Sequence, residues 1–298
     1  MKRRWVLAMA GLVACGSAVN HERLGDEAVA AENLTLALAE YRASLQSGPR
    51  SRVLVKFGTV ALGLGEWAEA IEAFRDLEST DPASSLQAAT GLELAARGAR
   101  RSGDVTALRD AVMTLRTVAP ERLEGRLAFS LALSGTLPPN EAVTILPHAL
   151  SAAPDAERVD SLLLLYGQAF QEVAACEDAI RIYQTLLRRS RTERDQAAAS
   201  MAECAVTLGD DATSLDRVEA AEEWYSLALE VDSGSSVGRR ALLGVAGARV
   251  AAGDTVAALD ALESIIAHGA PTDSLSQVAL QQLSALGVGA ANPLEPRP

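Results

Sequence analysis

A small residue, replaced once by Leu, recurs in the same phase along this chain at intervals of 33 to 42 residues. At six of the seven recurrences we assign the other small residue of the repeat to the position twelve places earlier, and at all seven an aromatic or apolar side chain lies four positions later. A period of this size is typical of a chain that stacks one structural unit many times, so that each unit contacts only its neighbours. The recurring positions are Ala37, Ala70, Leu108, Ala142, Ala179, Ala221 and Ala258.

Composition and local pattern both predict that the repeated unit is helical. Hydrophobic residues make up 49% of the chain and aromatic residues only 4%, so the core must be built mainly from Ala, Leu and Val. Ala and Leu favour helices, and apolar residues recur within each segment at i, i+3, i+4 and i+7, as on one helix face. Small residues let two antiparallel helices approach closely, and Pro ends a helix. Four prolines follow the second helix in phase: Pro49, Pro82, Pro120 and Pro154.

The second repeat carries the clearest motif. It reads GEWAEAIEAF from Gly65 to Phe74 and is followed by Asp-Pro. This segment resembles the second half of a tetratricopeptide (TPR) repeat, which has a Gly turn, a small residue (here Ala70) and an aromatic residue four positions later. The resemblance implies an all-α, right-handed TPR-like solenoid of about seven helix-turn-helix repeats over residues 20–271. The alternative is a generic Ala-rich helical bundle, but four prolines in phase favour the TPR-like fold.

Repeat six departs from the common spacing. Its first small residue, Ala202, lies nineteen positions before Ala221, and we interpret residues 210–216 as a polar insertion between its two helices, since an insertion at a turn costs little stability. Beyond the last repeat, residues 272–287 are expected to form a C-terminal capping helix with a polar outer face. Residues 288–298 contain Pro and are expected to be a disordered tail.

The first residues have the pattern of an export signal. Three basic residues precede an apolar stretch that is too short to span a bilayer. The box Leu-Val-Ala-Cys, which ends at Cys15, resembles the lipobox of bacterial lipoproteins. We therefore predict that residues 1–14 are a lipoprotein signal peptide, that Cys15 is lipidated, and that residues 15–19 form a short tether. The alternative is an ordinary cleaved signal peptide in which Cys15 has no role.

The lipobox resemblance also implies a location. An Asp after the Cys resembles an inner-membrane retention signal in some diderm bacteria, whereas Gly16 and Ser17 follow Cys15 here. We expect the chain in the bacterial cell envelope, at the periplasmic face of the outer membrane rather than the inner membrane. Several acyl chains, such as palmitate, would hold it there durably, because one chain alone binds only marginally.

Charge and residue types argue against several functions. The net charge of -12 gives no attraction for phosphate backbones, so no nucleic-acid partner is expected. Residues 234–238 match G-x-S-x-G, but the strand that a hydrolase needs before its Ser is not predicted here, and we interpret the segment as a turn with a Ser N-cap. The three histidines have no partner at metal-ligand spacing. We expect no enzyme activity, no metal, no cofactor and no small-molecule substrate.

Two cysteines remain in the repeat array. Cys176 begins the second helix of repeat five, and Cys204 lies in the first helix of repeat six. Those helices are expected to pack together, so the two side chains can meet. An oxidising compartment would join them in a disulfide. The alternative is a pair of buried free thiols.

The TPR resemblance implies a binding surface, because in that family the first helix of each repeat lines a concave groove. The corresponding residues give a mixed lining, basic at one end and aliphatic or amide further on. Such a groove would take a protein or peptide partner with acidic and apolar anchors. The alternative is that these are ordinary solvated or packing positions. The candidate residues are Arg52, Glu93, Arg97, Arg100, Leu127, Gln168 and Gln171.

Three functional hypotheses follow. The first is a lipid-anchored periplasmic protein-interaction scaffold, similar to the TPR lipoproteins of envelope, secretion or pilus assembly. The second is a soluble exported TPR chaperone or adaptor. The third is an enzyme or regulatory domain among the weaker repeats, and no acid–base pair or phosphate-binding loop supports it.

Overall fold

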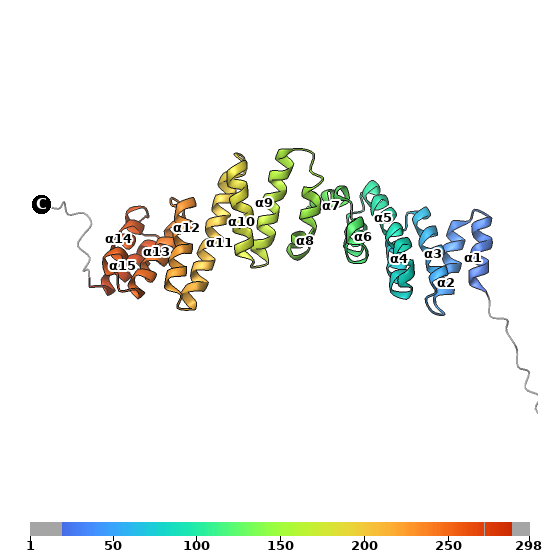
Figure 1. Ribbon diagram of the computed structural model, residues 1–298, viewed down its shortest axis with the longest axis horizontal. Helices are drawn as coiled ribbons and strands as arrows, with labels where there is room; N and C mark the ends of the chain where they lie inside the picture. The colour runs from blue at the N-terminus through green and yellow to red at the C-terminus, as the bar shows by residue number, and fades with distance from the viewer. Residues whose placement is uncertain (1–19, 271, 288–298) are drawn as a thin grey trace, which may run out of the picture. The chain divides into compact units, whose positions relative to one another are not determined.

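A computed structural model of the chain describes residues 20–270 and 272–287 (Figure 1). In that part of the chain all regular secondary structure is helical, with fifteen α-helices and two short 3-10 turns. The chain divides into an N-terminal unit, residues 1–123, and a C-terminal unit, residues 124–298. The predicted signal peptide, the lipidation site at Cys15 and the predicted tail all lie outside the described residues.

The N-terminal unit contains three antiparallel helix pairs, and each helix packs on the next one in the chain. Repeat one has α1 (His21–Ala30) and α2 (Leu34–Leu45). Repeat two has α3 (Ser51–Leu64) and α4 (Trp67–Thr80), and repeat three has α5 (Ser85–Ser102) and α6 (Val105–Val118). Pro82 and Pro120 start the 3-10 turns η1 (Pro82–Ser84) and η2 (Pro120–Arg122), which follow the second helices of repeats two and three.

The C-terminal unit contains four more pairs and a final single helix. Repeat four has α7 (Gly125–Ala132) and α8 (Pro139–Leu150), and repeat five has α9 (Ala156–Glu172) and α10 (Cys176–Arg189). Repeat six has α11 (Arg194–Ser214) and α12 (Val218–Asp232), and repeat seven has α13 (Ser236–Ala251) and α14 (Thr255–Ala267). The last helix, α15 (Ser274–Ala285), packs on α14 and α13 within the segment predicted to form the cap.

The recurring residues lie where the helices of a repeat meet. All seven are buried, and five of them have no exposed surface. Aromatic side chains of the second helices sit against glycines of the first helices. A Cβ atom on Gly58 would lie 2.9 Å from the Phe74 ring, and one on Gly91 of the next repeat would overlap with the same ring. Phe74 is therefore wedged between its own repeat and the next, and Tyr225 lies in the same way between Gly209 and Gly244. Seven helix pairs, each with its recurring residue buried, confirm the predicted all-α, TPR-like fold class.

The prediction for repeat six was wrong in its register. Residues 210–214 are not an insertion, because they form the last turn of α11, and only residues 215–217 connect it to α12. The small residue that faces Tyr225 is Gly209, not Ala202, and Gly209 lies the usual twelve positions before Ala221. The additional residues therefore lie at the start of α11, which has 21 residues where α3 has 14. The carboxylate of Asp210, in this last turn, accepts a 2.8 Å hydrogen bond from the Tyr225 hydroxyl.

Candidate protein-binding surface

In the N-terminal unit, the predicted surface residue Arg52 belongs to an ion cluster. Its Nε lies 2.7 Å from a carboxylate oxygen of Glu22, whose residue is only 6% exposed. Lys56 Nζ lies 3.0 Å from Glu22 and 2.7 Å from Asp26. The cluster joins α1 to α3, so its charges stabilise the first two repeats and are already paired.

The charges in this cluster shift one another's pKa values. The hydrogen bond from Arg52 lowers the pKa of Glu22, and the hydrogen bond from Lys56 lowers the pKa of Asp26. Burial acts to lower the pKa of Lys56, but its hydrogen bonds to both carboxylates outweigh that effect and raise it. Burial, together with a hydrogen bond to Asp26, raises the pKa of Tyr41. At neutral pH Glu22 and Asp26 therefore stay ionised, Lys56 stays protonated and Tyr41 stays neutral.

Helix α5 carries three of the predicted residues. Glu93 is buried, and its carboxylate lies 2.6 Å from Arg122 Nε and 3.5 Å from Arg97. Arg100 lies exposed in the last turn of the helix. Glu93 thus fixes two arginines instead of meeting a partner, and the expected basic end of a groove is reduced mainly to Arg100.

The prediction of Leu127 as a surface residue was wrong, because its residue is only 1% exposed. Helix α7 has eight residues, and Leu127, Ala128, Leu131 and Ala132 form one buried face on it. In so short a helix, every turn is needed to bury apolar side chains against α8, with which it packs.

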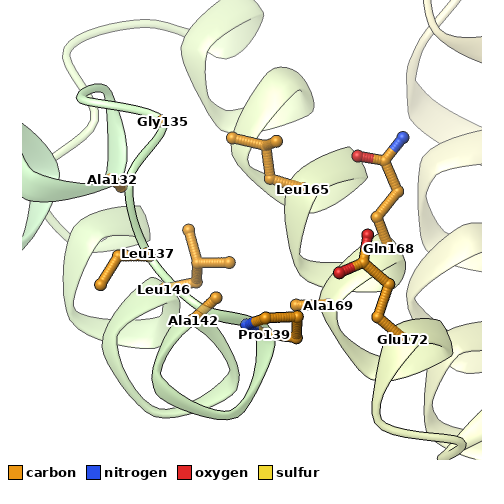
Figure 2. A pocket seen from close by; sticks show the side chains of 10 residues that line it. All are labelled: Ala132, Gly135, Leu137, Pro139, Ala142, Leu146, Leu165, Gln168, Ala169 and Glu172. Atoms are coloured by element: carbon orange, nitrogen blue, oxygen red, sulfur yellow. The ribbon is translucent and has the colours of Figure 1, made fainter.

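The short α7 leaves a cavity beside α9 (Figure 2). In repeat two the first helix continues six residues beyond its small residue Gly58, whereas α7 ends two residues beyond the equivalent Ser130. Residues 133–138, with Gly135 at φ 67°, form a non-helical link instead. The resulting cavity has a volume of about 130 Å³. Its wall on the α7–α8 side is formed by Ala132, Gly135, Leu137, Pro139, Ala142 and Leu146.

Helix α9 forms the other wall, with Leu165, Gln168, Ala169 and Glu172 (Figure 2). Leu165 is 41% exposed, so solvent reaches the cavity. Gln168 and Glu172 carry the polar groups on this side. Glu172 is exposed and has no basic partner in the part of the chain that the structure describes. The cavity therefore combines an apolar interior with one unpaired carboxylate at its edge.

Of the seven predicted surface residues, only Gln168 lines this cavity. Gln171 points elsewhere: its Nε2 donates to Glu203 at 3.1 Å, and its carbonyl oxygen accepts from the Tyr183 hydroxyl at 3.2 Å. Gln171 thus links α9 to α10 and α11. Leu165 and Glu172 were missed because the prediction counted fixed motif positions and did not consider that a first helix could end early.

The cavity lies in the more acidic of the two units. Residues 124–287 contain 23 acidic and 11 basic side chains, whereas residues 20–123 contain 15 and 12. A net negative field of this kind attracts cationic partners and raises their association rate. The free carboxylate of Glu172 and the negative field around it therefore both favour a positively charged partner.

Cys176 and Cys204 are brought together as predicted. Their Sγ atoms lie 2.7 Å apart, and both residues are buried. Ser235 caps α13, as expected for a Ser N-cap, because its hydroxyl accepts from the N–H groups of Val237 and Gly238 at 3.1 Å. Among the described residues, no group of three or more His, Cys, Asp or Glu side chains is placed to hold a metal ion. No helix in the described ranges is both long and apolar enough for a membrane span.

No protein-family model matches the chain, and no curated protein matches it. Several solved structures align with most of its length. The TPR2AB domain of yeast Sti1 in a pHSP90 complex covers 89% of this chain and 95% of its own, at 15% identity and a TM-score of 0.30. The apo form of the quorum sensor NprR from B. thuringiensis covers 90% and 80%, at 15% identity and a TM-score of 0.35. The C-terminal part of a TPR repeat-containing protein from Cytophaga hutchinsonii covers 87% and 98%, at 14% identity and a TM-score of 0.36. At these TM-scores the likeness supports no particular function.

Proposed function

We propose that this protein is an interaction scaffold whose C-terminal unit binds a peptide segment of a partner protein. The observation that carries the proposal is the cavity between α7–α8 and α9, with Leu165 in its wall and Glu172 at its edge. The segment inserts one apolar side chain and places a Lys or Arg beside Glu172.

The size of the cavity suits one apolar side chain. A cavity of roughly 150 Å³ lined by Leu, Ile and Phe holds a benzene-sized group, so about 130 Å³ accommodates a Leu, Ile or Met side chain. Burying such a side chain stabilises a complex by about 1.5–3 kcal/mol. An exposed ion pair with Glu172 adds about 0.2–1 kcal/mol. Together they provide an anchor, and further contacts along the segment must supply the rest of the affinity.

The preferred partner chemistry differs from the sequence-based expectation. That expectation included acidic anchors, because arginines were assigned to the groove. In the structure two of those arginines meet carboxylates of the same chain: Arg52 is paired with Glu22, and Arg97 lies 3.5 Å from Glu93. The free charge beside an apolar cavity is instead the carboxylate of Glu172, so a basic anchor is favoured.

Selection from a random peptide library on the full chain tests this proposal. Bound peptides should be enriched in an apolar residue close to Lys or Arg, and Glu172→Lys should shift the selection towards Asp or Glu. Leu165→Glu should abolish enrichment, whereas Leu215→Glu, which changes an exposed Leu in the α11–α12 turn, should not. The proposed site would be refuted if the same peptides were enriched on the Glu172→Lys and Leu165→Glu variants as on the unchanged chain.

We also propose that the chain is anchored by lipid at Cys15 and acts in the periplasm, in envelope, secretion or pilus assembly. The support is the sequence pattern of the first fifteen residues alone. The alternative is a soluble exported chaperone or adaptor. Cys15→Ala followed by membrane fractionation separates them: loss of membrane association supports the anchor, and unchanged soluble protein in both forms contradicts it.

A further inference from the structure

Two thiols of the C-terminal unit face each other across neighbouring repeats. Cys176 is the first residue of α10, and Cys204 lies near the middle of α11. Helices α10 and α11 pack directly on each other. We propose that Cys176 and Cys204 form a disulfide that joins repeat five to repeat six. This proposal is independent of the peptide-binding function.

The surroundings of the two sulfur atoms support a bond. The Sγ–Sγ distance is 2.7 Å, well below the roughly 3.5–4.0 Å of an ordinary contact between carbon atoms. Cys204 has no exposed surface, and Cys176 is 6% exposed. In the described part of the chain, each thiol has only the other as a hydrogen-bond partner. The two helices therefore already hold the sulfurs close to bonding distance.

Buried side chains enclose the pair. Tyr183, Met201 and Ala205 belong to the same buried cluster, and none is more than 2% exposed. The position next to Cys204 is Glu203, which accepts the hydrogen bond from Gln171 of α9. A covalent link at Cys204 therefore joins α10 to α11 beside the hydrogen bond that connects α11 to α9.

The oxidant is a disulfide of a small molecule, such as glutathione disulfide, or of a thiol–disulfide oxidoreductase. The thiolate of Cys176, the more exposed of the two, attacks one sulfur of that disulfide and releases the other as a thiolate, which takes up a proton. The thiolate of Cys204 then attacks Cys176 Sγ and releases the second oxidant sulfur. The two cysteines lose two electrons and two protons, and the oxidant becomes two thiols.

The second step is expected before the fold closes. Burial raises the pKa of the Cys204 thiol, so its reactive thiolate is scarce in the folded chain. A chain that folds in an oxidising compartment encounters the oxidant while Cys204 is still accessible. Once formed, the bond is shielded by the same burial.

Thiol counting on the full chain carrying Cys15→Ala tests the proposal, because only two thiols then remain. The unfolded, reduced chain is refolded in mixtures of reduced and oxidised glutathione, quenched with acid, and alkylated under denaturing conditions. At an oxidising ratio we expect no alkylation without reductant and two alkylated thiols with it. Cys176→Ser and Cys204→Ser, as matched controls, should each show one alkylated thiol or one glutathione adduct. Two alkylated thiols in the oxidised sample would overturn the proposal.

A second measurement separates a native bridge from an incidental one. The ratio of reduced to oxidised glutathione at which half of the chains are bridged is measured without denaturant and in concentrated urea. A native bridge should persist to a ratio at least about tenfold more reducing without urea, since a fold that favours the bond shifts its equilibrium by linkage. Equal ratios would contradict the proposal, even if some bridge forms.

Discussion

Replacing Gly209 with Ala tests the wedge of Tyr225 between two repeats. A Cβ atom on Gly209 would lie 2.5 Å from the Tyr225 ring, which cannot move away because Gly244 touches it from the other side. Overpacking of this kind costs about 1–3 kcal/mol, while Ala in place of Gly inside a helix contributes about 1 kcal/mol of stability. Gly209→Ala should therefore be neutral or destabilising by up to about 2 kcal/mol.

Gly247→Ala is the matched control. Gly247 also lies inside a helix, α13, but a Cβ atom there would meet nothing within 4 Å. This variant should gain about 1 kcal/mol from helix propensity alone, so the two variants should differ by about 1–3 kcal/mol. With a slope of about 3 kcal/mol per molar urea, the unfolding midpoints followed by circular dichroism should differ by about 0.3–1 M. Equal midpoints would refute the wedge.

Two further predictions concern ionised groups. Glu22 and Asp26 have lowered pKa values in the folded state, so their contribution to stability is present above about pH 4 and is lost as the pH falls through the folded values. Glu22→Gln should therefore weaken the dependence of the urea unfolding midpoint on pH between 5 and about 2. An unchanged dependence would show that the ion cluster of Glu22, Asp26, Arg52 and Lys56 does not stabilise the fold. Hydrogen bonds, first from the Ser276 backbone N–H and then from Arg239, lower the pKa of Asp273 to about 2. An NMR titration should find that value, Arg239→Gln should raise it, and an ordinary value in the unchanged chain would show that Asp273 does not cap α15.

Much of the fold could be predicted from the sequence, because TPR-like packing needs particular residues at particular separations. Two helices in contact are marked by a glycine twelve positions before the recurring small residue and an aromatic residue four positions after it. Gly167 and Tyr183 are such a pair. The same rule, applied to Gly209, gives the correct register of repeat six. The error there came from placing additional residues in a turn, when a helix can lengthen at its start without disturbing the pairing.

The binding surface was less predictable, for two physical reasons. Motif positions show which helix face a residue occupies but not whether its charge is already paired, and Glu22 and Glu93 each neutralise basic residues from another helix or turn. The cavity depends on where α7 ends, and the non-helical link that follows α7 contains Gly135 at positive φ and the adjacent prolines Pro138 and Pro139. Those residues were visible in the sequence as a stop signal, but the space beside α9 appears only once the helices are packed.

The central claim is that the cavity beside α9 binds an apolar side chain next to a basic one. The most direct measurement is calorimetric binding of a selected peptide to the full chain, in a charge-swap cycle between Glu172 and the basic peptide residue, with Leu165→Ala and Leu215→Ala alongside. We predict that Leu165→Ala weakens binding about 5- to 30-fold, for a loss of about 1–2 kcal/mol, and that Leu215→Ala does not. We also predict that reversing both charges together costs less binding free energy than the sum of the two single reversals, by about 0.2–1 kcal/mol. The claim would be contradicted if the effects of the two charge reversals on binding free energy were additive and the two Leu variants had equal affinities.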